Sequence, residues 1–216
     1  QENLYAGTGA GAASDADTCY NIAFGCNAGA SNCAGGCNVF IGSCAGKNLT
    51  SGVCNVFIGR AGTCVNGNFN IAIGNDTGGS ATTSTGEYNI SFGDYAGCCL
   101  TSGLANISIG YNAGQKIKSG NGNIFMGRYT GCGSQDSDYN IAIGQRAGKC
   151  MTSAGCNIFI GLCAGLNASS GCKNILLGCN TGKCITTGYC NVFIGNYAGV
   201  GDAAITGYRN TVVGDC

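Results

Sequence analysis

The sequence predicts an all-β fold, a β-solenoid in which about 17 residues form each turn of one elongated array. Three observations lead to this prediction. One short pattern, N-h-x-h-G-x-x-A-G with h an apolar residue, recurs along the chain. Glycine stands at fixed places in each copy, and the 216 residues include 41 glycines and no proline. An apolar period of 3.6 residues, which an amphipathic helix would need, does not survive these glycines.

Thirteen copies of the pattern, here called rungs, each begin at an asparagine. Most rungs are 17 residues long, and the asparagines are Asn3, Asn21, Asn38, Asn55, Asn70, Asn89, Asn106, Asn123, Asn140, Asn157, Asn174, Asn191 and Asn210. Such self-similarity predicts a single repeat array over residues 1–216 rather than separate domains. Thirteen rungs at a strand spacing of ~4.8 Å would give a rod of roughly 60 Å.

Each rung is expected to begin with a short strand. With the asparagine as position 1, positions 2 and 4 are apolar in almost every copy, as at Ile141 and Ile143, and this alternation of β-branched residues is typical of a strand. We expect positions 2, 4, 8 and 12 to point into the core and position 3 to point outward. The asparagines are expected to stack in a column, with each amide bonded to the next.

Three corners are predicted from glycine. Position 5 is glycine in every copy, position 9 is glycine in most, and a third glycine comes near position 15, as at Gly52. Glycine at fixed offsets marks places that need a positive φ or a close backbone approach. The irregular rungs are shortened at Gly59-Arg60-Ala61-Gly62 or lengthened after Gly78 and Gly199. Because these changes fall in corners and loops, the frame should persist through them.

Large residues alternate between two places in the repeat. Position 3 is Phe at Phe193, where Cys190 precedes the asparagine, but Ala at Ala142, where Tyr139 precedes it. We interpret this alternation as volume compensation at a close-packed site. With position 3 outward, the aromatic stripe predicts an interface with other chains, and a three-cornered rung favours a homotrimer. A monomer with scattered surface aromatics is the alternative.

The 18 cysteines predict disulfide bonds. The chain has no histidine and no C-x-x-C pair, so it lacks the usual zinc and redox motifs, and disulfides imply a setting outside the cytosol. Several cysteines lie seven residues apart at the two ends of one strand, a span of roughly 20 Å that no disulfide can bridge. Bridges between chains are favoured, and bridges between neighbouring rungs (Cys26–Cys44, Cys163–Cys179) are the alternative. The candidates are Cys19, Cys26, Cys37, Cys44, Cys54, Cys156, Cys163, Cys172, Cys179, Cys190 and Cys216.

Other chemistry is sparse in the sequence. Asp15 with Asp17, and Asp136 with Asp138, form D-x-D loops that are candidate calcium ligands or, alternatively, solvated turns. Asn48 and Asn167 begin glycosylation sequons in corner loops. No Ser-His or Cys-His pair is possible, so we expect neither an enzyme nor a cofactor.

The net charge and the hydropathy of the sequence limit the classes of partner that we expect. The net charge is zero, and only 9% of residues are charged, so nucleic acid is not an expected partner. The sequence has no run of about 20 apolar residues, so no membrane span is expected.

The rungs from Asn38 to Gly52 and from Asn174 to Gly188 follow the pattern with a T-S-G or T-T-G turn. This pattern resembles the repeats of trimeric phage and viral tail fibres and bacterial surface fibres, and it is similar to the β-roll head of trimeric autotransporter adhesins. The resemblance implies a trimeric, extracellular, non-enzymatic fibre or adhesin shaft at a cell or virion surface. The period of 17 and the cysteine content depart from that class.

Function is therefore expected to be structural. The expected partners are other copies of the chain, with a cell surface or a glycan as a further candidate. An ice-binding or other surface-binding solenoid, and a segment of a tail-fibre receptor-binding protein, are the alternatives. Because Asn3 and Asn210 open rungs so near the two ends, we also expect head-to-tail stacking with Cys216 as a covalent join, the alternative being one segment of a longer fibre polypeptide.

Overall fold

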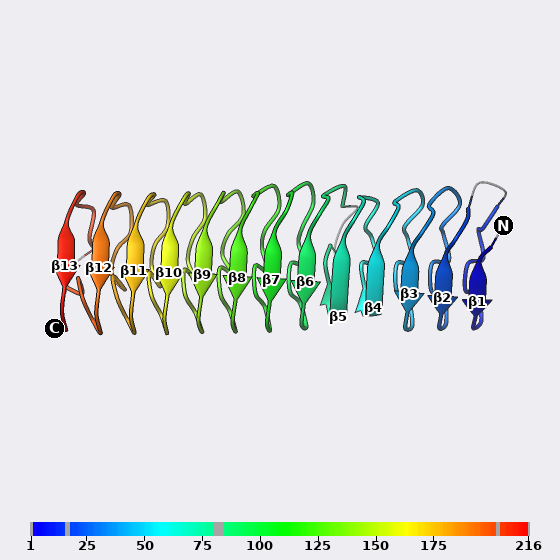
Figure 1. Ribbon diagram of the computed structural model, residues 1–216, viewed down its shortest axis with the longest axis horizontal. Helices are drawn as coiled ribbons and strands as arrows, with labels where there is room; N and C mark the ends of the chain where they lie inside the picture. Colours follow the sequence, from blue (N-terminus) through cyan, green and yellow to red (C-terminus); the bar gives the residue numbers. More distant parts are fainter. Residues whose placement is uncertain (1, 16–17, 80–83, 202–203, 216) are drawn as a thin grey trace.

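A computed structural model describes residues 2–15, 18–79, 84–201 and 204–215, and within these ranges the chain is a parallel β-solenoid without helix. Thirteen strands pair in sequence order in one sheet, so the two ends of the chain lie at opposite ends of the rod (Figure 1). The strands are β1 (Leu4–Ala6), β2 (Ile22–Phe24), β3 (Val39–Ile41), β4 (Val56–Ala61), β5 (Ile71–Thr77), β6 (Ile90–Phe92), β7 (Ile107–Ile109), β8 (Ile124–Met126), β9 (Ile141–Ile143), β10 (Ile158–Ile160), β11 (Ile175–Leu177), β12 (Val192–Ile194) and β13 (Thr211–Val213). The predicted solenoid is confirmed.

Neighbouring rungs stack in register because the repeat length is nearly constant. Residues Ile141 to Ile143 pair with Ile158 to Ile160, each residue with the one 17 positions later. The other sides of the rung carry no named strand, but they stack through backbone hydrogen bonds, such as that from Gly148 N–H to the Ala164 carbonyl at 2.9 Å. Every side of the rod is thus held by backbone bonds from rung to rung.

The one shortened rung is absorbed where the sequence predicts. Strands β4 and β5 are longer than the others, and their register shifts between Arg60 and Ala61, opposite Asp76. Asp76 has a φ of 50°, and the equivalent corner residue of the next rung, Tyr95, has a φ of 57°. Arg60 forms an ion pair with the Asp76 carboxylate across this register shift. The frame resumes at β6, so the prediction that it persists is confirmed.

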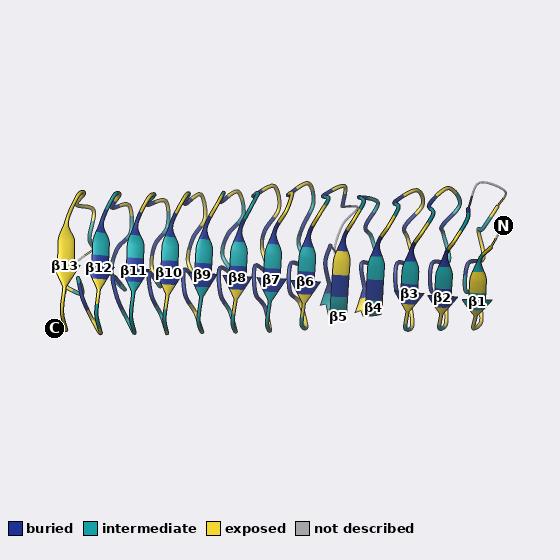
Figure 2. Cartoon of the chain, viewed as in Figure 1, coloured by how far each residue is buried: buried dark blue, intermediate teal, exposed yellow. Residues whose placement is uncertain are grey.

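The strand residue that faces the core is position 3, and the prediction that positions 2 and 4 face it is wrong. In β10, Phe159 is fully buried while Ile160 is 40% exposed. Figure 2 shows the same buried middle residue in most strands. Alternation places position 3 on the same side as the position 1 asparagine, and the asparagine column lies inside. The predicted burial of positions 8 and 12 is confirmed, as at Ala147 and Met151.

The asparagine column is confirmed. Asn174 donates its backbone N–H and its side-chain amide to Oδ1 of Asn157, at 2.9 and 3.0 Å. Its amide also donates to the Gly188 carbonyl at 2.8 Å, which closes the same rung from inside. Equivalent bonds recur from Asn21 to Asn210, and Asn70 alone makes its ladder bond through its backbone N–H only.

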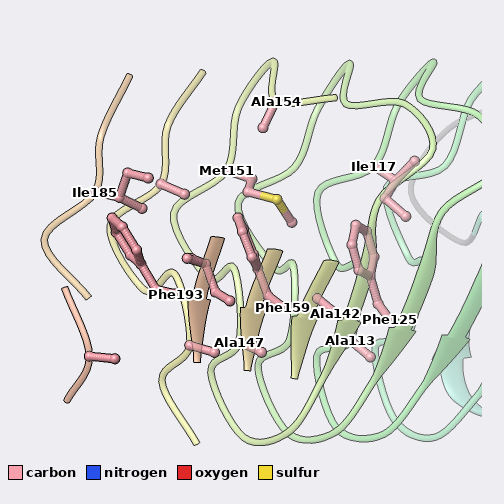
Figure 3. Close-up of a cluster of buried hydrophobic side chains, with 14 of the residues drawn as sticks. Ala113, Ile117, Phe125, Ala142, Ala147, Met151, Ala154, Phe159, Ile185 and Phe193 are labelled. Carbon is pink, nitrogen blue, oxygen red and sulfur yellow. The ribbon is translucent and has the colours of Figure 1, made fainter. Parts of the chain in front are cut away.

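Core volume is balanced between positions 3 and 12 in five rungs, whereas Phe40 with Leu49, and Leu176 with Ile185, are large at both positions. Phenylalanine at position 3 faces a small residue in two rungs, and a small residue at position 3 faces a long aliphatic side chain in three others. These pairs are Phe125 with Ser134, Phe159 with Ala168, Ser91 with Leu100, Ser108 with Ile117, and Ala142 with Met151. Figure 3 shows Phe125 and Phe159 rising from their strands among Ile117 and Met151. The predicted compensation of side-chain volume therefore exists in these five rungs.

The compensating partner differs from the one that the sequence suggested. The residue before the asparagine lies at the surface, and Tyr139 is 65% exposed there, whereas Ala142 is buried. The interpretation that these two positions share volume is wrong. It failed because two residues on opposite sides of the chain cannot fill the same space.

Glycine is needed at position 5 for two reasons. Gly161 has a φ of 135°, and a Cβ placed on it would lie 2.3 Å from the Gly178 carbonyl oxygen. The corner after each strand therefore brings two backbones too close for any side chain. This corner sets the width of the flat strand face.

Candidate interaction surface

The outer face of the sheet is an apolar strip, here defined as positions 2 and 4 of strands β1 to β13. Position 2 contributes Leu4, Ile22, Val39, Val56, Ile71, Ile90, Ile107, Ile124, Ile141, Ile158, Ile175, Val192 and Thr211. Position 4 contributes Ala6, Phe24, Ile41, Ile58, Ile73, Phe92, Ile109, Met126, Ile143, Ile160, Leu177, Ile194 and Val213. Thr211 is the single polar member.

The strip is solvent-exposed along the rod. Phe92 is 51% exposed and Ile194 is 38% exposed, and members of the strip elsewhere are half-buried against their neighbours in the adjacent strands. Because the strands are in register, the side chains form two continuous rows roughly 60 Å long at the usual strand spacing. An apolar surface this continuous is unusual on a monomer and is typical of an interface. The predicted outward stripe thus exists, but it consists of the mostly aliphatic residues of positions 2 and 4 rather than of position 3 aromatics.

Ten of the predicted disulfide cysteines flank the strip. Cys19, Cys37, Cys54, Cys156, Cys172 and Cys190 lie at the corner before the strand, and Cys26, Cys44, Cys163 and Cys179 lie at the corner after it. Four strands, β2, β3, β10 and β11, carry a cysteine at both ends.

Neighbouring rungs also bring flanking cysteines together. The Cys44 N–H donates to the Cys26 carbonyl at 2.9 Å, and the Cys37 N–H donates to the Cys19 carbonyl at 3.0 Å. The seventeen cysteines in the described ranges all have free thiols, and Cys216 lies outside those ranges. Bridges between chains and bridges between rungs both stay predictions.

A second group of cysteines lies on the other sides of the rung, and sequence reasoning did not single them out. They are Cys33, Cys64, Cys98, Cys99, Cys132, Cys150 and Cys184. Among them Cys98 and Cys99 are adjacent in sequence, and their sulfur atoms are 3.6 Å apart. The sequence shows that the two cysteines are neighbours, but it does not show that their sulfur atoms come into contact.

Aromatic and cationic side chains gather at the corner after strands β6 to β8. The Tyr111 ring packs edge-on against Tyr95 and Tyr129, with centroids 6.4 and 5.4 Å apart. The Arg128 guanidinium lies 5.0 Å from the centre of the Tyr129 ring, a cation–π distance. Sequence reasoning missed this cluster because its members come from different rungs.

The predicted calcium ligands have protein partners where the structure describes them. Oδ1 of Asp136 accepts a bond from the Ser119 hydroxyl at 2.5 Å, and Oδ1 of Asp138 accepts one from the Asn121 N–H at 2.7 Å. These carboxylates therefore join neighbouring rungs. Asp15 is exposed, and Asp17 lies outside the described ranges. No three His, Cys, Asp or Glu side chains come together as a metal site would need in the part of the chain that is described.

Both glycosylation candidates are exposed at position 11 of their rungs, where a glycan would have room. Asn48 follows Lys47 in the loop before the buried Leu49, and Asn167 holds the equivalent place before the buried Ala168. Attachment of a glycan stays a prediction.

The comparisons with known proteins leave the function open. No protein-family model, no characterised protein and no solved structure was found to match this chain. Within the described ranges the surface has no pocket, and no helix there is long and apolar enough to cross a bilayer. The apolar strip and its flanking cysteines are therefore the candidate functional site.

Proposed function

We propose that this chain is a structural, non-enzymatic subunit of an extracellular fibre, whose apolar strip is buried against other copies of the same chain. The observation that carries the proposal is the unbroken apolar strip on one side of the rod. Burying aliphatic surface contributes about 25 cal/mol per Å², so two rows along the whole rod favour self-association strongly. Repetition makes the contribution grow with every rung.

Three copies around an axis parallel to the rod fit this strip best. A rung has three sides and exposes the strip on one of them, so three strips can meet on a central axis with their other sides in water. With rotational symmetry, the start of one chain's strand lies beside the end of the next chain's strand at the same height. The cysteines at both ends of β2, β3, β10 and β11 suit that arrangement, because each corner then brings two thiols together.

The resemblance of the repeat to fibre and adhesin repeats supports the same role. It supports placement at a cell or virion surface, and so do the many cysteines, which are typical of oxidising compartments. An ice-binding face would need ranks of hydroxyl groups, whereas the outward positions here are apolar except at Thr211. The observations therefore favour association between chains over binding of ice.

The proposal extends to lengthwise growth. Strands β1 and β13 each pair on one side only within the described ranges, so their outer edges are free to pair with further rungs. Those rungs belong either to another copy of the chain or to more of the same polypeptide. Electron micrographs of native material distinguish threads of indefinite length from rods of one fixed length.

The test is the native mass of the reduced protein, by light scattering during gel filtration. We expect a trimer, and we expect the double variant Ile141→Lys with Ile143→Lys to dissociate it, because two charges would be buried in the apolar centre. The matched control is Thr152→Lys with Ser153→Lys, which adds the same charges to exposed positions of the same rung and should remain trimeric. A wild-type monomer at micromolar concentration, or a strip variant that still forms the trimer, would overturn the proposal.

The covalent part of the proposal has its own test. Gel electrophoresis of oxidised protein without reductant, after free thiols are blocked, is expected to show a trimer that reductant converts to a monomer. A monomer on both gels would rule out bridges between chains while leaving the trimer itself to the mass measurement.

A further inference from the structure

Cys98 and Cys99 lie away from the apolar strip, at positions 10 and 11 of the rung that begins at Asn89. Cys98 is buried and Cys99 is partly exposed, and their sulfur atoms are 3.6 Å apart within hydrogen-bond contact. The Cys98 thiol also reaches the Gln115 carbonyl of the next rung at 3.7 Å. One thiol is thus held in place and the other is accessible from solvent.

The neighbouring rung adds positive charge beside this pair. Lys116 has the same position in its rung as Cys99 has in its own, and Lys118 follows two residues later. The hydrogen bond from Cys98, followed by the charges of Lys118 and Lys116, lowers the pKa of Cys99 to about 6. The hydrogen bond to Cys99, together with burial, raises the pKa of Cys98. The outer thiol is therefore ionised first.

We propose that Cys98 and Cys99 form a redox-active dithiol that exchanges with low-molecular-weight disulfides and closes to a disulfide between adjacent residues. The Cys99 thiolate attacks one sulfur of the small disulfide, whose S–S bond breaks and releases one thiol after it takes up a proton. Cys98 then loses its proton and attacks the Cys99 sulfur, which releases the second small thiol. The two cysteines are oxidised by two electrons, and the small disulfide is reduced to two thiols.

This bridge is reversible because of where its two cysteines lie. Adjacent Cα atoms are about 3.8 Å apart, less than the 4.4–6.8 Å that disulfides usually span, so the ring is strained and easily reduced. Disulfides whose Cα atoms lie within the usual range do not carry that strain. The pair therefore suits reversible exchange better than permanent stapling.

The same chain supplies controls for this site. Cys132 has the repeat position of Cys98, and Cys150 has that of Cys99, but neither has a cysteine beside it in sequence. Burial raises the pKa of Cys132, and Cys150 of the following rung lies close enough to raise it further. Each of these two residues, with the other replaced by Ser, therefore reports what a single cysteine at its position does under the same conditions.

The experiment equilibrates the full, reduced chain with glutathione buffers of varied ratio, followed by acid quenching, alkylation and chymotryptic digestion. Cleavage after Tyr95 and Leu100 isolates the fragment from Ala96 to Leu100 for mass measurement. We expect the fragment to lose two hydrogens and to resist alkylation. Cys132 in the Cys150→Ser variant, and Cys150 in the Cys132→Ser variant, should each take up a single alkyl or glutathione group. A fragment that carries glutathione without closing, or two alkyl groups at every ratio, would overturn the proposal.

The exchange kinetics of the wild-type chain provide a second measurement, which two variants extend. At pH 6 about half of Cys99 is ionised, and after allowing for its lower intrinsic nucleophilicity we expect exchange roughly tenfold faster than for a model peptide thiol. The pH midpoint of that rate should rise when Lys118→Gln removes a charge. Cys98→Ala should stop the reaction at the mixed disulfide on Cys99. A midpoint near the ordinary thiol value in the wild-type chain would contradict the assignment.

Discussion

Asn157 donates two hydrogen bonds to one oxygen, Oδ1 of Asn140, from its backbone N–H at 3.1 Å and from its side-chain amide at 2.9 Å. Asn140 in turn donates to Asn123 of the preceding rung. Each asparagine inside the stack is therefore acceptor for one neighbour and donor to the other. A carboxylate cannot donate, a hydroxyl has a single hydrogen to donate and an apolar group can do neither, so none of them could make all the bonds of this amide.

Replacing a ladder asparagine should be costly. Asn140→Ala removes the acceptor of the buried Asn157 N–H and the donor to the Ala154 carbonyl. Buried groups left unpaired cost about 1–3 kcal/mol each, so we expect a loss of roughly 3 kcal/mol or more in unfolding free energy. Chemical denaturation followed by circular dichroism measures it. Asn167→Ala, at an exposed loop position, is the control and should change stability by less than about 0.5 kcal/mol.

The balance of volume across the rung predicts a compensating pair of substitutions. Phe159→Ala should cost about 3–5 kcal/mol through the cavity that it leaves. Adding Ala168→Met imitates the rung of Ala142 and Met151 and should recover part of that loss. A double-mutant cycle on the denaturation midpoints isolates the coupling. Losses that simply add would show that positions 3 and 12 do not share space.

The residue before the asparagine has a left-handed backbone, whatever its side chain. Ala105 has a φ of 55° there, and Gly122 holds the equivalent position in the next rung with a φ of 63°. A left-handed conformation costs a non-glycine residue about 1–2 kcal/mol. We therefore expect Ala105→Gly to raise the unfolding free energy by about 1 kcal/mol and Gly122→Ala to lower it. Thermal unfolding of both variants tests the signs, and a loss in Ala105→Gly would contradict the assigned backbone.

The corner glycines at position 5 should tolerate no side chain. Gly161→Ala would put a Cβ against the Gly178 carbonyl and would also force alanine to a φ of 135°. We expect a loss of about 4 kcal/mol or more, visible as failure to fold or as a split unfolding transition. Gly155→Ala is the matched control, because its Cβ would meet nothing closer than the Asp138 carbonyl at 3.6 Å. Similar losses in the two variants would mean that the close approach is not the cause.

The sequence predicts the architecture well because the repeat encodes it several times over. The period predicts the rung, and the glycine offsets predict its corners, as at Gly161. The asparagines predict the ladder. The shortened stretch around Arg60 also lies where the register shifts. Each of these signals is local, and each recurs in many rungs.

The sequence does not tell which face of the strand is buried, because both faces are apolar. Ile158 and Phe159 are equally plausible core residues by hydropathy. Two signals could have decided the question. Positions 1 and 3 are two residues apart, so they point to the same side of the strand, and Ala142 and Met151 have complementary sizes. The predicted outward stripe rested on the same wrong choice of face. Its position in the rung was therefore wrong, although its apolar character was right. The Cys98–Cys99 contact needed side-chain directions that no pattern supplies.

Because the rungs stack in register, the number of repeats sets the length of the rod. Because Ile141 pairs with Ile158 and Ile158 pairs with Ile175, removing residues 141–157 would join two rungs whose bonds already match. The rod would become shorter by one strand spacing, ~4.8 Å, and nothing else in its cross-section would change. The length of the rod therefore changes in whole repeats, and a gene that duplicates or deletes one repeat can set that length without altering the core or the surface of the other rungs.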